Sequence, residues 1–201
     1  MEAFDRKSYR IPHASGRPDW SAVPAEALYP CRWSPAPPPA AELKAVWTEE
    51  ALLVRLESFA APARAVNTEP DSPVWEDSCL EFFFSADGET YINLEANANG
   101  ALRASIGPDR HARRLLRELG VPLPQADTAV TPAGWTLTLT IPAALPETLL
   151  GVQLCRGLRL RGNFYACGDK TPAPYYAAWS PVGTETPDFH RPEFFGKLLL
   201  I

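Results

Sequence analysis

The chain has 201 residues, of which 46% are hydrophobic and 21% charged, the composition of an ordinary globular domain of moderate size. Its formal net charge of -5 argues against a protein whose main task is binding nucleic acid. Its apolar runs are shorter than the roughly 20 residues that a membrane-spanning helix requires, so we expect neither nucleic acid nor a membrane as a partner.

The first 40 residues are expected to form an irregular, proline-rich segment packed on a domain that spans residues 41–201. The stretch "YPCRWSPAPPPA" is typical of a stiff connector, and a ligand for an SH3-like partner is the alternative. The first 16 residues lack the apolar region of a signal peptide. The four cysteines form neither a CxxC pair nor a zinc-finger spacing: Cys31, Cys79, Cys155 and Cys167. We therefore expect reduced thiols in a cytoplasmic protein.

From residue 41 the hydrophobic pattern has a period of two, which is typical of strands. The stretches "ELKAVWT" and "ALLVRLES" predict two strands joined by a turn at Glu49 and Glu50. A long loop, 59–74, then leads to "PVWEDSCLEFFFSA" and "YINLEANANGALRASI". These two stretches predict three further strands.

The pairing of these three strands follows from their hydrophobic faces. A hairpin loop of Asp87, Gly88 and Glu89 sets Phe84 opposite Ile92, and the same pairing continues through Phe82–Leu94 and Leu80–Ala96. A loop at residues 98–100 pairs Ala96 with Leu102 in the same way. A slip by one residue would turn every side chain to the other face. The apolar face of this sheet is therefore predicted to form the core.

The remaining segments predict one helix and three strands. In "GPDRHARRLLRELG", apolar residues recur at helical spacing, which predicts a helix over 109–119 that ends near Gly120. Four arginines form its outer face, which we interpret as a solvated basic surface: Arg110, Arg113, Arg114 and Arg117. The stretches "WTLTLTIP", "LRLRGNFYACGD" and "FFGKLLLI" read as strands. The fold class is all-β, an antiparallel β-sandwich with one short helical insertion.

The other face of the three-stranded unit is polar. One cross-strand row contains Glu81, Glu95 and Arg103, and the next row contains Asn93. Two glutamates this close repel each other unless a cation, a shared proton or hydroxyl donors relieve them. The face is either a solvated, salt-bridged surface or a site for a ligand with many hydroxyls, since each sugar hydroxyl both donates and accepts hydrogen bonds.

Six stretches of the chain together resemble the family 9 carbohydrate-binding modules, in particular their stand-alone family 9-like relatives. They are "PVWEDSCLEFFF", "YINLEANANG", "WTLTLTIP", "GNFYACGD", "YYAAWSPV" and "DFHRPEFFG", and they span most of residues 41–201 in the family's order. The resemblance implies a β-sandwich that binds a mono- or oligosaccharide, often at a chain end, between two tryptophans. The function that we expect from it is carbohydrate binding without catalysis.

The resemblance also implies roles for individual residues. Trp75 and Trp179 match the two clamp tryptophans, Glu81 the carboxylate on the sheet, and Asn93 and Asn163 further polar contacts. Together with the polar face, this gives the following candidate ligand-binding residues: Trp75, Glu81, Tyr91, Asn93, Glu95, Arg103, Asn163 and Trp179. Members often hold structural calcium, for which four loop carboxylates are candidates: Asp71, Asp77, Asp87 and Asp169. The sequence leaves the identity of the sugar open.

Two other function classes are weighed against carbohydrate binding. A small glycosidase would use Glu81 and Glu95, but we expect Arg103 to keep both carboxylates ionised, which leaves no catalytic acid. A haem-binding sandwich would need axial ligands. The candidates for these are Met1 and the scattered histidines His13, His111 and His190.

Overall fold

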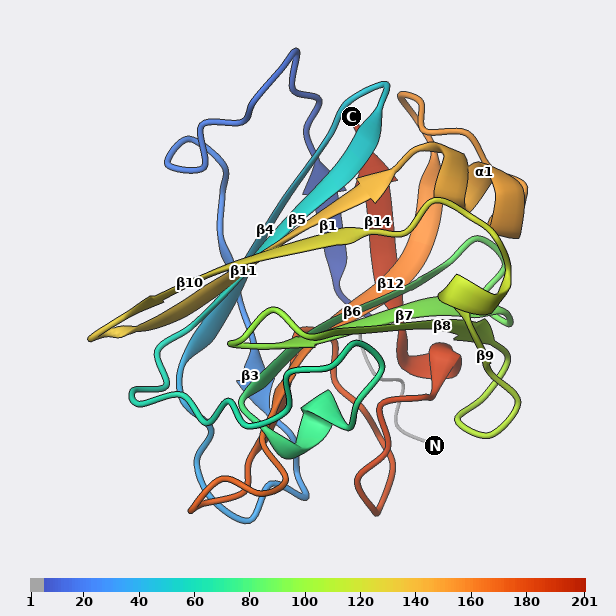
Figure 1. Cartoon of the computed structure of the whole chain (residues 1–201). Helices are drawn as coiled ribbons and strands as arrows, with labels where there is room; N and C mark the ends of the chain where they lie inside the picture. Colours follow the sequence, from blue (N-terminus) through green and yellow to red (C-terminus); the bar gives the residue numbers. More distant parts are fainter. Residues whose placement is uncertain (1–5) are drawn as a thin grey trace.

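A computed structural model describes residues 6–201 (Figure 1). Met1 and the rest of the first five residues lie outside it, and so does the part of the signal-peptide prediction that rests on them. Two packed sheets make up the described chain, as the period-two pattern predicts. No helix in this part of the chain has the length and apolarity needed to span a membrane.

The larger sheet has nine strands within residues 6–201. Its main path runs β1 (Ser8–Ile11), β14 (Gly196–Leu200), β12 (Arg159–Cys167), β6 (Cys79–Ser85), β7 (Tyr91–Asn97), β8 (Leu102–Gly107) and β9 (Arg114–Leu115). Beside this path, β13 (Tyr176–Ala178) pairs with β12 and with β3 (Tyr29–Pro30). Only the β1–β14 pair is parallel among the strand pairs of these residues.

The smaller sheet has five strands in the described chain, all antiparallel. Its order is β10 (Gln125–Thr131), β11 (Gly134–Pro142), β5 (Ala51–Ser58), β4 (Ala41–Trp47) and β2 (Glu26–Ala27). Between residues 6 and 40 the chain thus adds β1, β2 and β3 to the two sheets. This segment is more regular than its proline content indicates.

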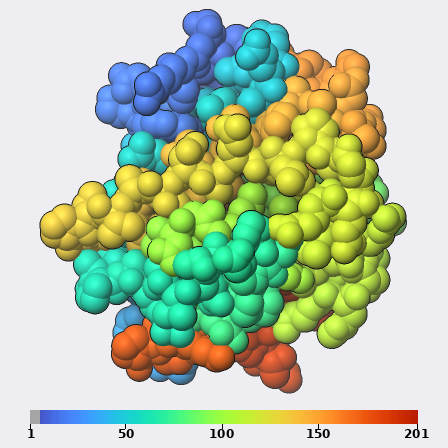
Figure 2. All heavy atoms as spheres, in the orientation of Figure 1, coloured from blue at the N-terminus to red at the C-terminus, as the bar shows by residue number. Residues whose placement is uncertain are grey.

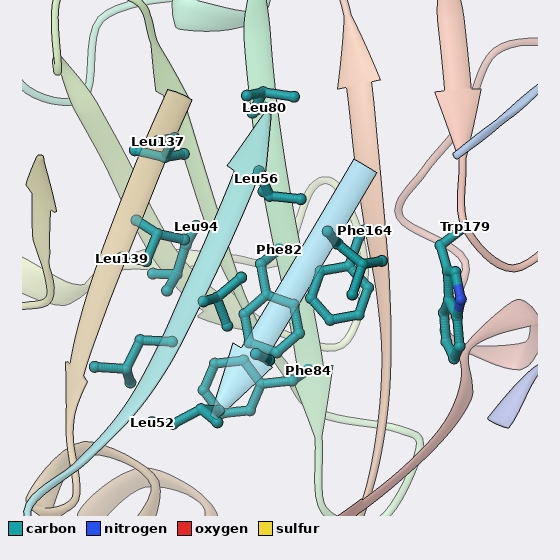
Figure 3. Close-up of a cluster of buried hydrophobic side chains, with 14 of the residues drawn as sticks. Leu52, Leu56, Leu80, Phe82, Phe84, Leu94, Leu137, Leu139, Phe164 and Trp179 are labelled. Atoms are coloured by element: carbon teal, nitrogen blue, oxygen red, sulfur yellow. The ribbon is translucent and has the colours of Figure 1, made fainter. Parts of the chain in front are cut away.

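The hydrophobic core lies between the two sheets (Figure 3). Leu80, Phe82 and Phe84 of β6 face this core, as do Leu137 and Leu139 of β11, and all are fully buried. Each such side chain contributes about 1.5–3 kcal/mol of hydrophobic free energy relative to exposure. Burial at every second position is what holds the strands in this register.

The predicted register of the central hairpins is confirmed. Phe84 pairs with Ile92, Phe82 with Leu94, and Leu80 with Ala96. On the next pair of strands, Ala96 lies opposite Leu102. The polar rows are confirmed with it, because Glu81 lies opposite Glu95, which in turn lies opposite Arg103.

The helix predicted over 109–119 is wrong. The Asp109 carboxylate accepts hydrogen bonds from the N–H groups of His111 and Ala112, which closes a turn. Residues 114–115 then pair with β8 as β9, and only a 3-10 turn, η2 (Leu116–Glu118), follows. Pairing with the sheet edge satisfies the backbone here and still buries Leu116, so the helical spacing of the leucines does not decide the structure.

The short α-helix of the fold lies instead at α1 (Ala144–Leu150), after β11. Gly151 ends it with a φ of 67°, and its N–H donates to the carbonyl of Pro146. Two further 3-10 turns are η1 (Val74–Glu76) and η3 (Pro192–Phe194).

Loops cover the face of the larger sheet that points away from the core. Beneath them lies a second buried cluster, here called the outer cluster: Cys31, Val74, Cys79, Phe83, Tyr91, Ala101, Tyr165, Cys167, Ala178, Val182, Phe189 and Phe195. On the visible face in Figure 2, the loop 59–74 (teal) meets the segment 108–124 (yellow-green), where Arg117 forms an ion pair with Asp71. The polar face is thus partly enclosed by loops rather than open to solvent.

Candidate functional site

A cavity of about 360 Å³ opens on the outer face of the larger sheet. Its aromatic lining comes from loops and from β13: Trp33, Trp75, Tyr176, Phe189 and His190. The charged lining combines acids with bases: Glu81, Glu95, Asp169, Asp188, Arg110 and Arg113. Cys167 and Pro187 complete it. Apolar rings beside converging polar groups are the usual composition of a small-molecule site, and the volume lies within the ~300–1,000 Å³ of such sites.

Glu81 and Glu95 form the floor of the cavity. They lie directly opposite each other on β6 and β7, and each is only 3% exposed. Burial and the neighbouring Glu95 raise the pKa of Glu81 well above its ordinary value. Burial also raises the pKa of Glu95, against the opposing effect of the Arg113 guanidinium. The floor therefore holds a proton more readily than two exposed carboxylates would, and it can donate as well as accept hydrogen bonds.

Two side chains orient Glu95. The Asn93 Nδ2 donates to Glu95 Oε1 over 2.6 Å, and the Arg113 Nη1 lies 3.3 Å from the same oxygen. Arg103 lowers the pKa of Glu95, as its place in the polar row predicts, but burial outweighs this effect and the pKa of both glutamates is raised. The Arg103 Nη1 donates to the carbonyl of Asp71 over 2.7 Å.

Trp75 forms one wall of the cavity from the 3-10 turn η1. The Asp169 N–H donates to the Trp75 carbonyl over 3.1 Å, which attaches this turn to the end of β12. The guanidinium of Arg103 lies 5.3 Å from the centre of the indole ring. Arg103 thus supports the Trp75 ring by a cation–π contact.

Tyr176 and Trp33 contribute another part of the lining. Their rings are 5.0 Å apart and meet edge to face. The strand β3 pairs with β13, and just beyond this pair the Tyr176 N–H donates to Ser34 Oγ over 3.0 Å. The proline-rich segment therefore brings Trp33 into the cavity through contacts with residues 142 or more positions later.

The structure places Trp179 elsewhere. Its ring is fully buried in the core between the sheets, where it packs edge to face on Phe164 at 5.7 Å (Figure 3). Side chains alternate along this segment, so Ala177 and Trp179 face the core while Tyr176 and Ala178 face the outer cluster. The ring at the cavity on this strand is therefore Tyr176, and the expectation that Trp179 faces Trp75 across a groove needs correction.

The other predicted residues lie behind the lining. Tyr91 is fully buried and its hydroxyl lies 3.0 Å from His190 Nδ1, while Asn93 holds Glu95. Asn163 is fully buried, and it donates to the Ser180 carbonyl and accepts from the Ser180 N–H. It fastens β12 to the segment after β13. Of the eight predicted residues, the structure brings Trp75, Glu81 and Glu95 to the cavity itself.

The calcium candidates do not assemble into a site. Asp77 Oδ2 accepts from the N–H groups of Val66 and Asn67, and Oδ1 pairs with Arg64. Asp71 pairs with Arg117, and Asp87 closes its own hairpin turn. Calcium requires several oxygen ligands around one point, and the four carboxylates form no such group within residues 6–201.

Most of the cavity residues that the sequence does not predict are brought to the cavity by contacts between distant segments of the chain. Nothing in the local pattern places Trp33 beside residue 176, or residues 187–190 over β6. Two others were accessible from the period of two. Cys167 continues the series Asn163 and Tyr165, whose side chains point away from the main core. Tyr176 lies three positions before Trp179, so the alternation along a strand turns the two side chains to opposite faces.

The chain is similar to known proteins both in sequence and in fold. The model of carbohydrate-binding family 9 matches residues 21–200. A candidate carbohydrate-binding protein from Bacteroides uniformis ATCC 8492 is 28% identical, with a TM-score of 0.82 over 98% of this chain and 100% of the other. No curated protein sequence matches the chain.

The fold is also that of a family 9 carbohydrate-binding module from Caldicellulosiruptor kristjanssonii. Its complex with cellotriose is 17% identical and has a TM-score of 0.71, over 96% of this chain and 93% of that one. A complex with glucose from the same organism is 15% identical and has a TM-score of 0.68, over 97% and 96%.

Proposed function

Because the chain belongs to carbohydrate-binding family 9, we propose that it binds a mono- or oligosaccharide, without hydrolysing it, in the cavity between Trp75 and Tyr176. The observation that carries the proposal is the combination at one cavity of aromatic rings with a buried carboxyl floor. Aromatic faces pack on the apolar face of a pyranose, and carboxyl and guanidinium groups bond its hydroxyls.

The floor residues are suited to orient a sugar. Glu81 and Glu95 are carried by paired strands, so neither has to be ordered on binding, and Arg113 supplies donors next to the acceptors of Glu95. The structures from Caldicellulosiruptor kristjanssonii hold cellotriose and glucose. A gluco-configured ring is accordingly the first ligand to test on this chain.

The binding is proposed to be non-catalytic. Glu81 and Glu95 stand side by side on one sheet face, whereas a glycosidase needs its two carboxyl groups on either side of the scissile bond. The raised pKa of Glu81 would suit a catalytic acid, so an assay of glycoside hydrolysis is needed to separate binding from catalysis. Incubation with aryl glycosides should release no phenol above the level of the Glu81→Gln variant; release that disappears in this variant would establish an enzyme instead.

Calorimetry with glucose, cellotriose and other small saccharides tests the site. Trp75→Ala should lower the affinity at least about tenfold, equivalent to about 1.4 kcal/mol, because the ring loses its stacking contact. Trp20→Ala, which removes a half-buried tryptophan outside the cavity, should leave the affinity unchanged. Equal affinity in both variants, or no binding heat with any saccharide by the wild type, would contradict the proposal.

A further inference from the structure

Three potential ligands for a metal ion converge beside the floor of the cavity. Cys79 and Glu81 are two positions apart on β6, so both side chains point to the outer face. Cys167 lies directly opposite Cys79 on β12. The two sulfur atoms and a Glu81 oxygen all lie within 4.8 Å of one another, and the Cys167 Sγ is 3.1 Å from Glu81 Oε1.

Each of these groups is almost inaccessible to water. Cys79 is 0% exposed, Cys167 2% and Glu81 3%. Burial raises the pKa of Cys79 to about 12, and the hydrogen bond with Cys79, followed by burial, raises the pKa of Cys167 well above its ordinary value. Both thiols are therefore harder to ionise than exposed cysteines, and a bound cation would have to stabilise the thiolates.

We propose that Cys79, Cys167 and Glu81 bind a thiophilic divalent cation of the Zn²⁺ type, with a fourth coordination position open to the cavity. Two thiolates favour Zn²⁺ over Ca²⁺ or Mg²⁺, which select oxygen ligands. Glu81 and Cys167 both line the cavity, which supplies the route of entry. Three protein ligands and one open position are a common zinc arrangement.

The local charges are compatible with this assignment. Two thiolates and one carboxylate exceed the charge of Zn²⁺ by one negative unit. Arg113 lines the same cavity and pairs with Glu95, the cross-strand neighbour of Glu81. Thiol and carboxyl ligands must be deprotonated to bind a metal ion, so the affinity should rise with pH.

Cobalt titration of the full chain, reduced and freed of metal by dialysis against a chelator, tests the site. One Co²⁺ per chain should bind with the near-ultraviolet charge-transfer absorption of cobalt thiolates, and Zn²⁺ should displace it. Cys79→Ser and Cys167→Ser should each weaken Zn²⁺ binding by about 100-fold, and Glu81→Gln by about tenfold without loss of the absorption band.

The chain provides matched controls for these variants. Cys31→Ser removes a buried thiol and Cys155→Ser an exposed one. Neither cysteine belongs to the group of Cys79, Cys167 and Glu81, so both variants should leave Zn²⁺ binding unchanged. No metal uptake by the reduced wild type, a bound Co²⁺ without the thiolate band, or uptake abolished only by Cys155→Ser would overturn the proposal.

A second measurement needs no variant. Zn²⁺ should protect Cys79 and Cys167 of the wild type from alkylation under mild denaturant, as mapped by mass spectrometry, and should leave Cys155 reactive. Equal alkylation of all thiols with and without Zn²⁺ would overturn the proposal. Neither experiment contains a saccharide, so a failure of the metal site is distinguishable from a failure of carbohydrate binding.

Discussion

His190 lines the cavity as a neutral imidazole. Burial and the nearby Arg113 guanidinium lower its pKa to about 2. Its ring lies 4.9 Å from that of Phe83, and its Nδ1 is 3.0 Å from the Tyr91 hydroxyl. The ring is thus a fixed, uncharged part of the lining, and protonation would place a cation beside Arg110 and Arg113.

This environment predicts an acid-sensitive contribution to stability. In the folded protein the pKa of His190 lies below the value of 6.5 for an unperturbed histidine. The stabilising contribution of the neutral ring is therefore complete above pH 6.5 and is lost as the pH falls below it. Between about pH 7.5 and about pH 5.5 the free energy of unfolding should drop by about 1.4 kcal/mol from this group. Urea titrations should show that drop removed in His190→Gln and retained in His111→Gln. An unchanged pH dependence in His190→Gln would contradict the assignment.

Trp179 should matter for folding and not for ligand contact. Replacing it with Phe leaves a void beside Phe164 and Tyr9, which should lower the free energy of unfolding by about 1–3 kcal/mol. Saccharide affinity, measured by calorimetry below the unfolding transition, should stay within about twofold of the wild type because the ring lines no part of the cavity. A tenfold loss of affinity with normal stability would place Trp179 at the ligand after all.

Individual residues show why the sequence identifies only part of the site. Glu81 and Glu95 are found from the register alone, because one apolar face fixes which side chains point the other way. The resemblance predicts Trp179 at the ligand, but side chains alternate through β13 and the residue after it, and this alternation directs Trp179 into the core. Trp33 and His190 reach the cavity on loops, and no local periodicity encodes such contacts.

At the scale of elements, the loop 59–74 determines where Trp75 lies. Asp77, at the end of η1, is fully buried and holds this loop through the N–H groups of Val66 and Asn67, with Arg64 as its ion-pair partner. Burial opposes ionisation of Asp77, but these hydrogen bonds outweigh it, and the pKa is lowered. One carboxylate therefore fastens a long irregular segment to β6.

Asp77→Asn should release this loop. An amide nitrogen placed against several donors cannot replace the carboxylate, so we expect a loss of about 3 kcal/mol in the free energy of unfolding. Limited proteolysis should cut within residues 59–74 faster than in the wild type. Glu69→Gln, an exposed carboxylate of the same loop, should change neither property. If the Asp77→Asn variant is cut no faster than the wild type, other contacts hold the loop.

The elements themselves were predictable to different degrees. Strands such as β11, with Trp135, Leu137 and Leu139 on one face, follow from alternation because that face is buried. The helical spacing in segment 109–119 predicts the wrong element, since an edge strand and a 3-10 turn also bury Leu116. The true helix, α1, has Gly151 as an end signal, but its seven residues are too few to show a clear helical period.

At the scale of the whole molecule, the larger sheet is covered on both faces. One face meets the smaller sheet across the main core, and the other carries the outer cluster beneath the loops. The strands under the cavity are therefore packed on both faces, whereas the loops supply its walls. This division explains why the floor is predictable from sequence and the walls are not.

A crystal structure of the chain soaked with glucose or cellotriose tests the central claim most directly. A sugar ring should lie in the cavity against the Trp75 ring, with its hydroxyls within hydrogen-bond distance of Glu81 or Glu95. A saccharide bound instead on the outward threonines of β11, with only water in the cavity, would contradict it.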